Sequence, residues 1–476
     1  MRASTTSGLN ASFSERPAWG QLQEVLEARR RASEPVADLK RFEDELHALF
    51  AAAEAEAIGS ELGRFDIDLP FVEIEGRRHR RVLRCEQTYW TAAGEIRVER
   101  SLYSTRHDGE HAVAALDLRA GIIEGRWTPR AAEQALWVVG HLTPQTAETL
   151  FKKIGNLQPS KSSLDRLPKA LSECWERRRE EFETALRQSE RVPKEATAVA
   201  VSLDGVMAPM KRTGARKERR AQTQADGKHL FGPAGFHEVG VGTVSLYDAE
   251  GNLLKTTRFS RMPEANKLTI KQSIEAELQT VLRQHPDLQV IKIADGVPSN
   301  WAYFRELQPD GRQVVDFYHA VEHLHSALQA AYGEISVTTT ARCKQLRHIL
   351  LEDQHGVEKV IRALRHLRNR YPRRARIAKS LDYFCRHRNA MRYAALRADN
   401  LPIGSGVVEA ACKTLVVQRL RCSGMRWSHA GGQAILTIRG WQQSARFDRA
   451  WQLLASTYKK NVSILDNVID IRVGHR

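Results

Sequence analysis

The chain of 476 residues has no continuous apolar run near eighteen residues, and its N-terminus lacks the apolar core of a secretion signal. We therefore expect neither a membrane-spanning helix nor a signal peptide. Cysteine is scarce as well, because six cysteines are scattered along the chain without a Cys-x-x-Cys pair. Scattered thiols are typical of a reducing compartment and argue against a disulfide framework or a zinc knuckle. Together these absences predict a soluble, intracellular protein.

Acidic residues are few relative to basic ones. The 57 Asp and Glu residues are outnumbered by 73 Lys and Arg residues, so the formal net charge is +16. With 42% hydrophobic and 27% charged residues, the chain is expected to be globular. The excess is greatest at residues 361–397, with twelve basic residues and one acid, and at 211–220, with six and one. Such a surplus indicates a polyanionic partner, of which DNA and RNA are the commonest.

Changes in the hydrophobic period divide the chain. Residues 19–58 have apolar residues at helical spacing, and three stretches between 71 and 103 alternate as short antiparallel strands do. The predicted parts are a disordered tail and N-terminal helices at 1–60, a small β-rich region at 61–125, a helical region at 126–190, an α/β core at 196–316, a basic helical insertion at 317–400, C-terminal helices that complete the core at 401–460, and a tail at 461–476. We expect the parts before the core to form a mixed strand and helix region that binds DNA.

A helix, a turn and a second helix are predicted at residues 143–154, 155–160 and 163–171. In a helix-turn-helix motif the second helix enters the major groove of DNA. Arg166 lies on that second helix, where its side chain could contact a guanine edge. Any two packed helices have the same pattern, so a plain helical hairpin is the alternative.

Residues 196–209 are small and β-branched apolar residues, which predict a strand buried on both faces, and Asp204 lies near its end. The segments that follow predict two strands joined by a hairpin turn, a helix at 266–284, a strand at 289–294 that ends in Asp295, a helix capped by Ser299, and a strand at 313–316. This order is that of a ribonuclease-H-like α/β domain, in which the strands carrying Asp204 and Asp295 are neighbours. The alternative is that Asp204 opens a turn with Gly205.

A third carboxylate follows the basic helical stretch at 318–400, in which one break is predicted at residues 371–372. A loop at 401–406 precedes a helix that sets Glu409 in its first turn, where the backbone amides favour a negative charge. Helix capping alone would explain Glu409. If Asp204, Asp295 and Glu409 instead converge, they repel one another unless cations lie among them, and Mg²⁺ or Mn²⁺ takes such oxygen ligands. Two such ions can activate a water or 3′-hydroxyl and stabilise the leaving oxygen of a phosphodiester.

At this point the chain resembles the DDE transposases of the ISKra type of bacterial insertion sequences, which are related to the Mutator-like group. The resemblance covers about residues 120–460 and is carried by five motifs: Ser202-Leu-Asp-Gly-Val, Ala294-Asp-Gly-Val-Pro-Ser-Asn-Trp, Asp316-Phe-Tyr-His-Ala-Val-Glu-His-Leu, Leu401-Pro-Ile-Gly-Ser-Gly-Val-Val-Glu-Ala-Ala-Cys-Lys, and Gly424-Met-Arg-Trp followed by Gly431-Gly-Gln-Ala-Ile-Leu. It implies a catalytic triad of Asp204, Asp295 and Glu409 that holds two Mg²⁺ or Mn²⁺ ions.

The resemblance further implies cleavage and strand transfer of double-stranded DNA by a homo-oligomer in the bacterial cytoplasm, at the nucleoid. It gives Asp316 and His319 as a D-x-x-H pair, and it assigns no role to Trp427. The basic residues expected to contact DNA are Arg166, Lys211, Arg212, Arg373, Arg374, Arg376 and Arg426.

Three alternatives compete with this interpretation. His319-Ala-Val-Glu322-His323 fits the H-x-x-E-H signature of inverted zinc proteases, because His319 and His323 share one helix face. A transposase-derived protein could bind DNA through the same basic residues without cutting it. A resolvase-type nuclease would cut DNA without rejoining it.

Overall fold

A computed structural model describes residues 17–105, 112–155, 157–211 and 235–464. The chain forms two compact units. The first unit contains Met1–Arg178 and Asp448–Arg476, and the second unit contains Arg179–Phe447. The N-terminal tail, expected to be disordered up to about residue 18, lies outside the described residues as far as residue 16, and so does Arg212, whose contact with DNA is predicted. No helix within the described ranges is long and apolar enough to cross a membrane.

The first unit contains a five-stranded antiparallel sheet in the order β10-β1-β2-β3-β4. Its strands are β1 (Phe71–Ile74), β2 (Arg77–Thr91), β3 (Gly94–Ser104), β4 (Val113–Ala114) and β10 (Val462–Ile464). The turn between β1 and β2 needs Gly76, whose φ of +77° is a conformation that side chains disfavour. Strand β10 comes from the segment predicted to be a tail. It pairs with the edge of β1, Val462 opposite Ile74, so residues 462–464 belong to this sheet.

Helices of the first unit lie before and after this sheet. They are α2 (Pro17–Arg31), α3 (Leu39–Gly63), α4 (Ala115–Ala120), α5 (Pro129–His141), α6 (Pro144–Ile154) and α7 (Lys161–Arg177), and α20 (Phe447–Ser456) begins at the unit boundary. The helical segment predicted at 19–58 is two helices, because the Asp38 side chain caps α3 by accepting from the amide of Arg41 at 3.1 Å. Helices α6 and α7 have the predicted order of helix, turn and helix. Thr143 caps the first and Ser160 the second.

The second unit is built on a five-stranded mixed sheet in the order β7-β6-β5-β8-β9. The strands are β5 (Ala198–Pro209), β6 (Phe236–Tyr247), β7 (Leu253–Arg261), β8 (Gln289–Ala294) and β9 (Arg312–Val315). Strands β5, β6 and β7 are antiparallel neighbours, whereas β8 and β9 run parallel to β5. The prediction that the strands before Asp204 and Asp295 are neighbours is confirmed, since Ser202 pairs with Ile293.

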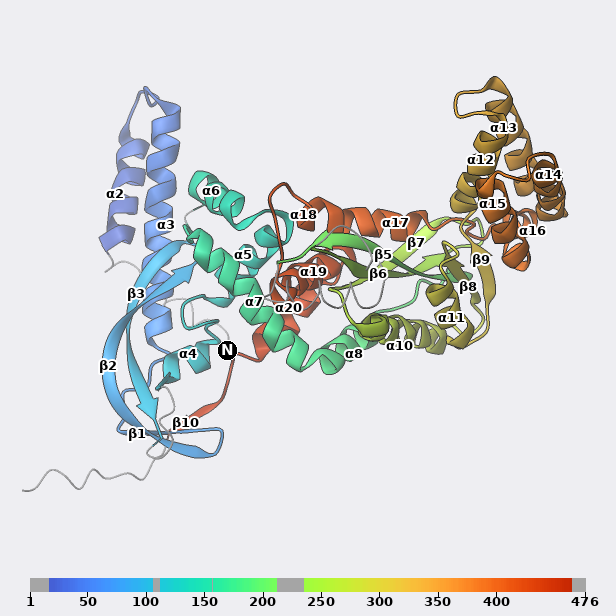
Figure 1. Ribbon diagram of the computed structural model, residues 1–476. Coiled ribbons are helices and arrows are strands. Elements are labelled where there is room, and N and C mark those ends of the chain that lie inside the picture. Colours follow the sequence, from blue (N-terminus) through green and yellow to red (C-terminus); the bar gives the residue numbers. More distant parts are fainter. Residues whose placement is uncertain (1–16, 106–111, 156, 212–234, 465–476) are drawn as a thin grey trace, which may run out of the picture. The chain divides into compact units, whose positions relative to one another are not determined.

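Helices cover both faces of this sheet, which explains why β5 is apolar on both sides (Figure 1). On one face lies α10 (Leu268–Gln284). A Cβ on Gly242 of β6 would come within 2.4 Å of Ile274, so this glycine permits the close approach of α10. On the other face Val239 and Val241 pack in one apolar cluster with residues of α17 (Gly406–Ala411), the π-helix η3 (Cys412–Val417), α18 (Gln418–Leu420) and α19 (His429–Gln443).

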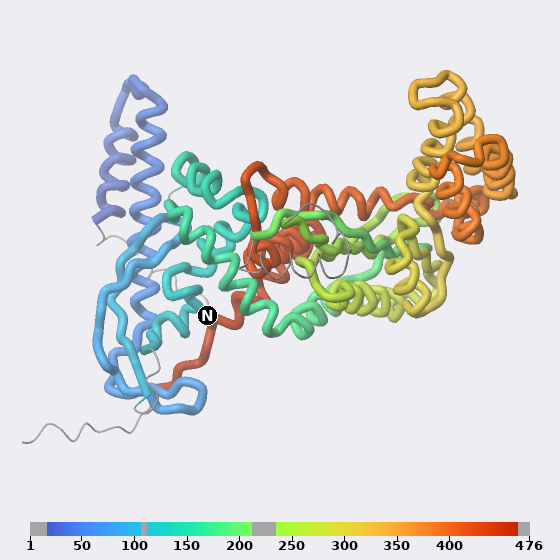
Figure 2. The backbone as a smooth tube through the Cα atoms, in the orientation of Figure 1, coloured from blue at the N-terminus to red at the C-terminus, as the bar shows by residue number. Residues whose placement is uncertain are grey.

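The segment predicted as a basic insertion is a group of helices (Figure 2). They are α12 (Phe317–Tyr332), α13 (Val337–Glu352), α14 (Gly356–Arg370), α15 (Ala375–Arg386), the short 3₁₀ turn η2 (Arg388–Ala390) and α16 (Tyr393–Ala398). The predicted break at 371–372 is present, but the chain also leaves helical structure at 333–336, 353–355 and around 387–392. The apolar faces of these helices share one hydrophobic core with the sheet, so the insertion is packed as part of the second unit.

The remaining helices of the second unit are α8 (Arg179–Ser189), α11 (Pro298–Glu306) and the 3₁₀ turn η1 (Ala265–Lys267). Helix α11 begins at Pro298 with Val297 at the cap position and without a side-chain cap, so the prediction that Ser299 caps it is wrong. Proline serves as the first residue of a helix because its ring presets φ and the first amides have no helical partner.

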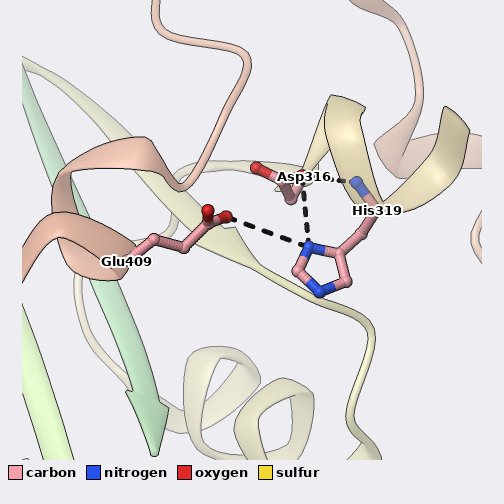
Figure 3. A group of neighbouring side chains, drawn as sticks. All are labelled: Asp316, His319 and Glu409. Atoms are coloured by element: carbon pink, nitrogen blue, oxygen red, sulfur yellow. Dashed lines mark hydrogen bonds and ion pairs between the residues drawn. The ribbon is translucent and has the colours of Figure 1, made fainter. Parts of the chain in front are cut away.

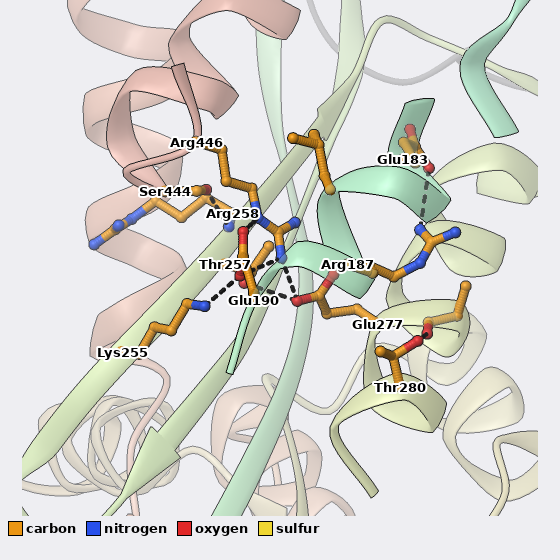
Figure 4. Close-up of polar contacts among 12 residues, drawn as sticks. Glu183, Arg187, Glu190, Lys255, Thr257, Arg258, Glu277, Thr280, Ser444 and Arg446 are labelled. Atoms are coloured by element: carbon orange, nitrogen blue, oxygen red, sulfur yellow. Dashed lines mark hydrogen bonds and ion pairs between the residues drawn. The ribbon is translucent and has the colours of Figure 1, made fainter. Parts of the chain in front are cut away.

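A buried ion network joins distant parts of the second unit (Figure 4). Arg446 follows α19 in the chain. Its guanidinium donates to Glu190 at 2.5 and 2.9 Å and to Glu277 of α10 at 2.6 Å. Lys255 of β7 pairs with Glu190, and the Thr257 hydroxyl donates to Glu277 at 3.0 Å. Because these charges are buried, each depends on its partners to replace lost solvation.

Candidate functional site

Asp204 and Asp295 lie at corresponding positions on two neighbouring strands. The last parallel pair between β5 and β8 is Ser202 with Ile293, and each aspartate comes two residues later. Neighbouring strands are about 4.7–4.9 Å apart, so both aspartates come just after the point where the pairing of β5 with β8 ends, at the carboxyl end of β8, and the charge of Asp295 acts on Asp204. This end of an α/β sheet is where such proteins usually bind ligands.

The carboxylate of Asp204 is half-buried against helix residues. Its Oδ1 accepts the amide of Gly205 at 2.7 Å, and its Oδ2 accepts the thiol of Cys412 at 3.5 Å. Burial raises the pKa of Asp204, and the charge of Asp295 adds to this increase. The charge of Lys267 acts in the opposite direction. A carboxylate that is disfavoured by burial and by a second carboxylate is one that a cation would stabilise.

The loop that carries Asp295 is held by hydrogen bonds from two elements. Asp295 Oδ1 accepts the amide of Val297 at 3.1 Å and lies 3.5 Å from the Asn300 side-chain amide. The same amide group of Asn300 donates to the carbonyl of Leu203 at 3.1 Å. Asn300 therefore connects strand β5 with the loop that follows β8. The hydroxyl of Tyr383 on α15 donates to the carbonyl of Asp295 at 3.0 Å.

Glu409 lies in a second cluster, together with Asp316 and His319 (Figure 3). The His319 Nδ1 is 3.3 Å from Asp316 Oδ1 and 4.0 Å from Glu409 Oε1. Ser405 connects the two acids as well, because its amide donates to Asp316 and its hydroxyl donates to Glu409 at 2.5 Å. As predicted, Glu409 is in the first turn of its helix, α17.

The cluster holds one cationic side chain between two carboxylates. Asp316 is fully buried at the N-cap of α12, where its Oδ1 accepts the amide of His319 at 2.6 Å. Burial alone would raise the pKa of Asp316, but hydrogen bonds from His319 and Ser405 lower it on balance. The hydrogen bond to Asp316 raises the pKa of His319 to about 9, so its imidazole is cationic at neutral pH. This cation faces the carboxylate of Glu409.

The three predicted carboxylates are therefore brought to one end of the sheet but do not form one tight group. A metal ion could be held by three or more His, Cys, Asp or Glu side chains whose ligand atoms all lie within 4.8 Å of one another. Within the described residues, the only such group is Asp316, His319 and Glu409. Glu409 is nevertheless connected to Asp204, because Cys412 lies three residues further along and contacts Asp204. Residues three apart share one helix face. The side chain of Glu409 is 46% exposed, and its oxygens and those of the two aspartates are the donor type that Mg²⁺ prefers.

His319 and His323 are not brought together as zinc ligands. The imidazole of His323 stacks on the ring of Tyr383 with centroids 3.8 Å apart and 17° between the planes. In the described part of the chain, His319 shares its ligand group with Asp316 and Glu409 rather than with His323. This geometry does not support the zinc-protease alternative.

The predicted DNA-contacting residues that the structure describes are exposed. In the first unit Arg166 lies on α7, and its Nε donates to the carbonyl of Ser162 at 3.3 Å. In the second unit Arg373 and Arg374 lie in the turn between α14 and α15. Arg376 lies in the first turn of α15, 3.7 Å from Glu334.

Lys211, Arg426 and Trp427 lie together at the end of β5. The amide of Lys211 donates to the carbonyl of Trp427 at 2.7 Å, and the Trp427 amide donates to Pro209 at 3.0 Å. The indole of Trp427 donates to the carbonyl of Leu420 at 3.0 Å. Trp427 thus forms a parallel bridge with Met210 just after β5, and the bond from Lys211 to Trp427 joins that lysine to the segment that carries Arg426.

Sequence reasoning missed Asn300, Tyr383, Ser405 and Cys412 as neighbours of the carboxylates. Asn300, Ser405 and Cys412 occur inside the motifs that carry Asp295 and Glu409, so their position in those motifs is a signal that could have found them. Tyr383 comes from α15, and no local pattern connects it to Asp295.

No family model matches the chain, and no curated protein matches it. Among solved structures, the chain is similar to the Drosophila P element transposase strand transfer complex, with 12% sequence identity, a TM-score of 0.25, and coverage of 72% of this chain and 83% of that chain. A likeness at this TM-score establishes neither a shared fold nor a shared activity.

Proposed function

We propose that the second unit is the catalytic domain of a DDE transposase of the ISKra type. The observation that carries this proposal is the matching position of Asp204 and Asp295 on two paired parallel strands. The strand order β7-β6-β5-β8-β9, with three antiparallel strands followed by two parallel ones, supports a ribonuclease-H-like fold for this unit. Glu409 supplies the third carboxylate from the helix that packs against β5 and β6.

In this proposal Asp204, Asp295 and Glu409 hold two Mg²⁺ or Mn²⁺ ions. Such ions supply activation of a water or 3′-hydroxyl and stabilisation of the leaving oxygen of a phosphodiester. The other residues keep the carboxylates in position. Asn300 fixes the loop of Asp295 to β5, and the cationic His319 together with Ser405 would hold Glu409 in the absence of a metal ion.

The substrate in this proposal is double-stranded DNA, namely the ends of an insertion sequence and a target. The net charge of +16 and the exposed arginines at the turn before α15 support binding to the DNA backbone. Recognition of the element ends requires contacts to base edges, and α7 of the first unit is the candidate for them. The protein would act as a homo-oligomer on DNA in the bacterial cytoplasm.

The test is an assay with the purified full chain, a plasmid that carries candidate element ends, and Mg²⁺. We expect breaks at the element ends and joined products with a short target duplication, and we expect none with Asp204→Asn. Cleavage without joined products would favour the resolvase-type nuclease. Tight binding to the ends without any break would favour a DNA-binding protein that does not cut.

A further inference from the structure

A cavity of about 550 Å³ lies in the second unit between α11 and the segment where α15 meets η2. Its polar and aromatic lining consists of Trp301, Arg305, Gln313, Arg386, His387 and Asn389. Cavities of this volume hold ligands of the size of a nucleotide. Gln313 lies on β9, the edge strand of the sheet, so the cavity borders that edge.

The charge of this cavity is positive. Arg305 and Arg386 line it, and no acidic side chain does. Among the residues that the structure describes, neither arginine forms a salt bridge, although many arginines elsewhere in the chain do. Two unpaired guanidinium groups beside one cavity favour an anionic ligand, and arginine matches the geometry of phosphate.

Two buried ring nitrogens of the lining also lack partners. Trp301 is 4% exposed, and within the described residues neither its Nε1 nor the Nε2 of His387 has a hydrogen-bond partner. Buried polar atoms are nearly always paired, so these two nitrogens give the cavity a polar wall, but neither atom is itself exposed to the cavity. Burial lowers the pKa of His387, and the charge of Arg386 lowers it further, so its ring is neutral at pH 7.

Aromatic rings also line the cavity, and the partly exposed ring of His387 is the one that a nucleobase could contact, since Trp301 is buried behind it. The rings of Trp301 and His387 have centroids 5.8 Å apart with 36° between the planes, and the Tyr383 ring lies 5.0 Å from His387. Bases stack on such rings whatever their sequence. The cavity is close to the candidate site, because Pro298 lines it three residues after Asp295.

We propose that this cavity binds a nucleotide unit, with its phosphate at Arg305 and Arg386 and its base on the ring of His387, beside the buried Trp301. The inference rests on the proposed function for its source of nucleotides, a DNA strand that passes the carboxylates. A free nucleotide has the same chemistry and is the other source.

The experiment uses the full chain labelled with 5-fluorotryptophan in EDTA, so that binding is observed without cleavage. The ¹⁹F resonance of Trp301 is the one that disappears in Trp301→Phe. The probes are a short single-stranded oligonucleotide, deoxyadenosine monophosphate, and deoxyadenosine without phosphate. We expect the oligonucleotide to shift the Trp301 resonance and deoxyadenosine to leave it unchanged. A saturable shift with the monophosphate as well would identify a free nucleotide as a ligand.

The double variant Arg305→Gln and Arg386→Gln should bind at least tenfold more weakly. The matched control, Lys271→Gln with Arg283→Gln on α10, removes the same charge and should bind as the unchanged chain does. The other tryptophan resonances report whether each variant is folded. An unmoved Trp301 resonance with both phosphate-bearing probes, or equal affinity of the double variant, would overturn the proposal. Asp204→Asn should bind normally, so failure of the proposed cleavage is distinguished from failure of this site.

Discussion

The hydroxyl of Tyr383 donates a hydrogen bond to the main-chain carbonyl of Asp295 at 3.0 Å, across 88 residues of sequence. The two residues come from different parts of the second unit, since Tyr383 lies on α15 and Asp295 follows β8. Gly296 permits this contact, because its φ is +99° and a Cβ there would lie 2.7 Å from the Tyr383 ring. The helical insertion therefore fixes the backbone that presents one of the proposed metal ligands.

Tyr383→Phe should slow DNA cleavage without weakening DNA binding. The substitution keeps the packed ring and removes one hydrogen bond, whose net value is about 0.5–1.5 kcal/mol, so we expect a rate loss of about two- to tenfold. The measurement is the single-turnover cleavage rate at saturating DNA. Tyr332→Phe at the end of α12 is the control and should cut at the normal rate. An unchanged rate in Tyr383→Phe would show that this bond does not position Asp295.

Neutralising the exposed arginines of the insertion should weaken binding to all DNA sequences alike. In the triple variant Arg373→Gln, Arg374→Gln and Arg376→Gln, the salt dependence of the binding constant should flatten by about one unit of slope for each DNA phosphate that is no longer neutralised. The control removes the same amount of charge from the first unit through Arg31 of α2, Arg41 of α3 and Arg64, which directly follows α3. If the DNA-binding constant depends on salt with the same slope in both triple variants, the arginines of the insertion do not contact DNA phosphates and are only exposed to solvent.

Arg166→Ala should weaken binding to the element end more than binding to unrelated DNA. If the guanidinium contacts a guanine edge, the loss on the cognate end is about 1–3 kcal/mol. Binding constants for both DNAs at one salt concentration measure it. Lys169→Ala, one turn further on α7 and paired with Asp165, should lose much less. If Arg166→Ala weakens binding to both DNAs equally, Arg166 contacts a phosphate and not a base. If it weakens neither, α6 and α7 form a structural hairpin that does not read DNA.

Arg446→Leu should strongly destabilise the second unit. The side chains of Arg446 and Glu277 are 8% and 6% exposed, so the substitution leaves buried carboxylates without their cation. We expect the free energy of unfolding to fall by about 3–5 kcal/mol in chemical denaturation. Arg312→Leu breaks a pair with Asp399 whose side chains are 49% and 44% exposed, and it should cost less than about 1 kcal/mol. Similar losses in both variants would contradict the role of the buried network.

Local patterns in the sequence predict the core of the second unit well. The apolar run before Asp204 is strand β5, and the spacing of Ile270, Ile274 and Leu278 is the buried face of α10. The pairing of β5 with β8 follows from the order of elements, because a helical crossover between parallel strands limits where they can lie. These features depend on residues that are close in sequence or on general rules of chain connection.

Features that depend on contacts between distant residues are not predictable in this way. Strand β10 completes the sheet of the first unit only because the edge of β1 accepts Val462 across most of the chain. The orientation of Glu409 toward His319 depends on Asp316, whose complete burial no sequence pattern shows. The break between α2 and α3 has local signals, namely Pro35 and the cap at Asp38, which a reading of apolar spacing alone passes over.

The most direct test of the central claim asks whether Asp204 binds the catalytic metal. Asp204→Cys replaces an oxygen ligand by sulfur, which Mg²⁺ accepts poorly and Mn²⁺ accepts more readily. The measurement is DNA cleavage by this variant with each ion, beside the unchanged chain and Asp204→Ser. We predict that Asp204→Cys is inactive with Mg²⁺ and regains cleavage with Mn²⁺, whereas Asp204→Ser stays inactive with both. Cleavage by Asp204→Cys at the unchanged rate with Mg²⁺, or no difference between the ions, would contradict a metal site at Asp204.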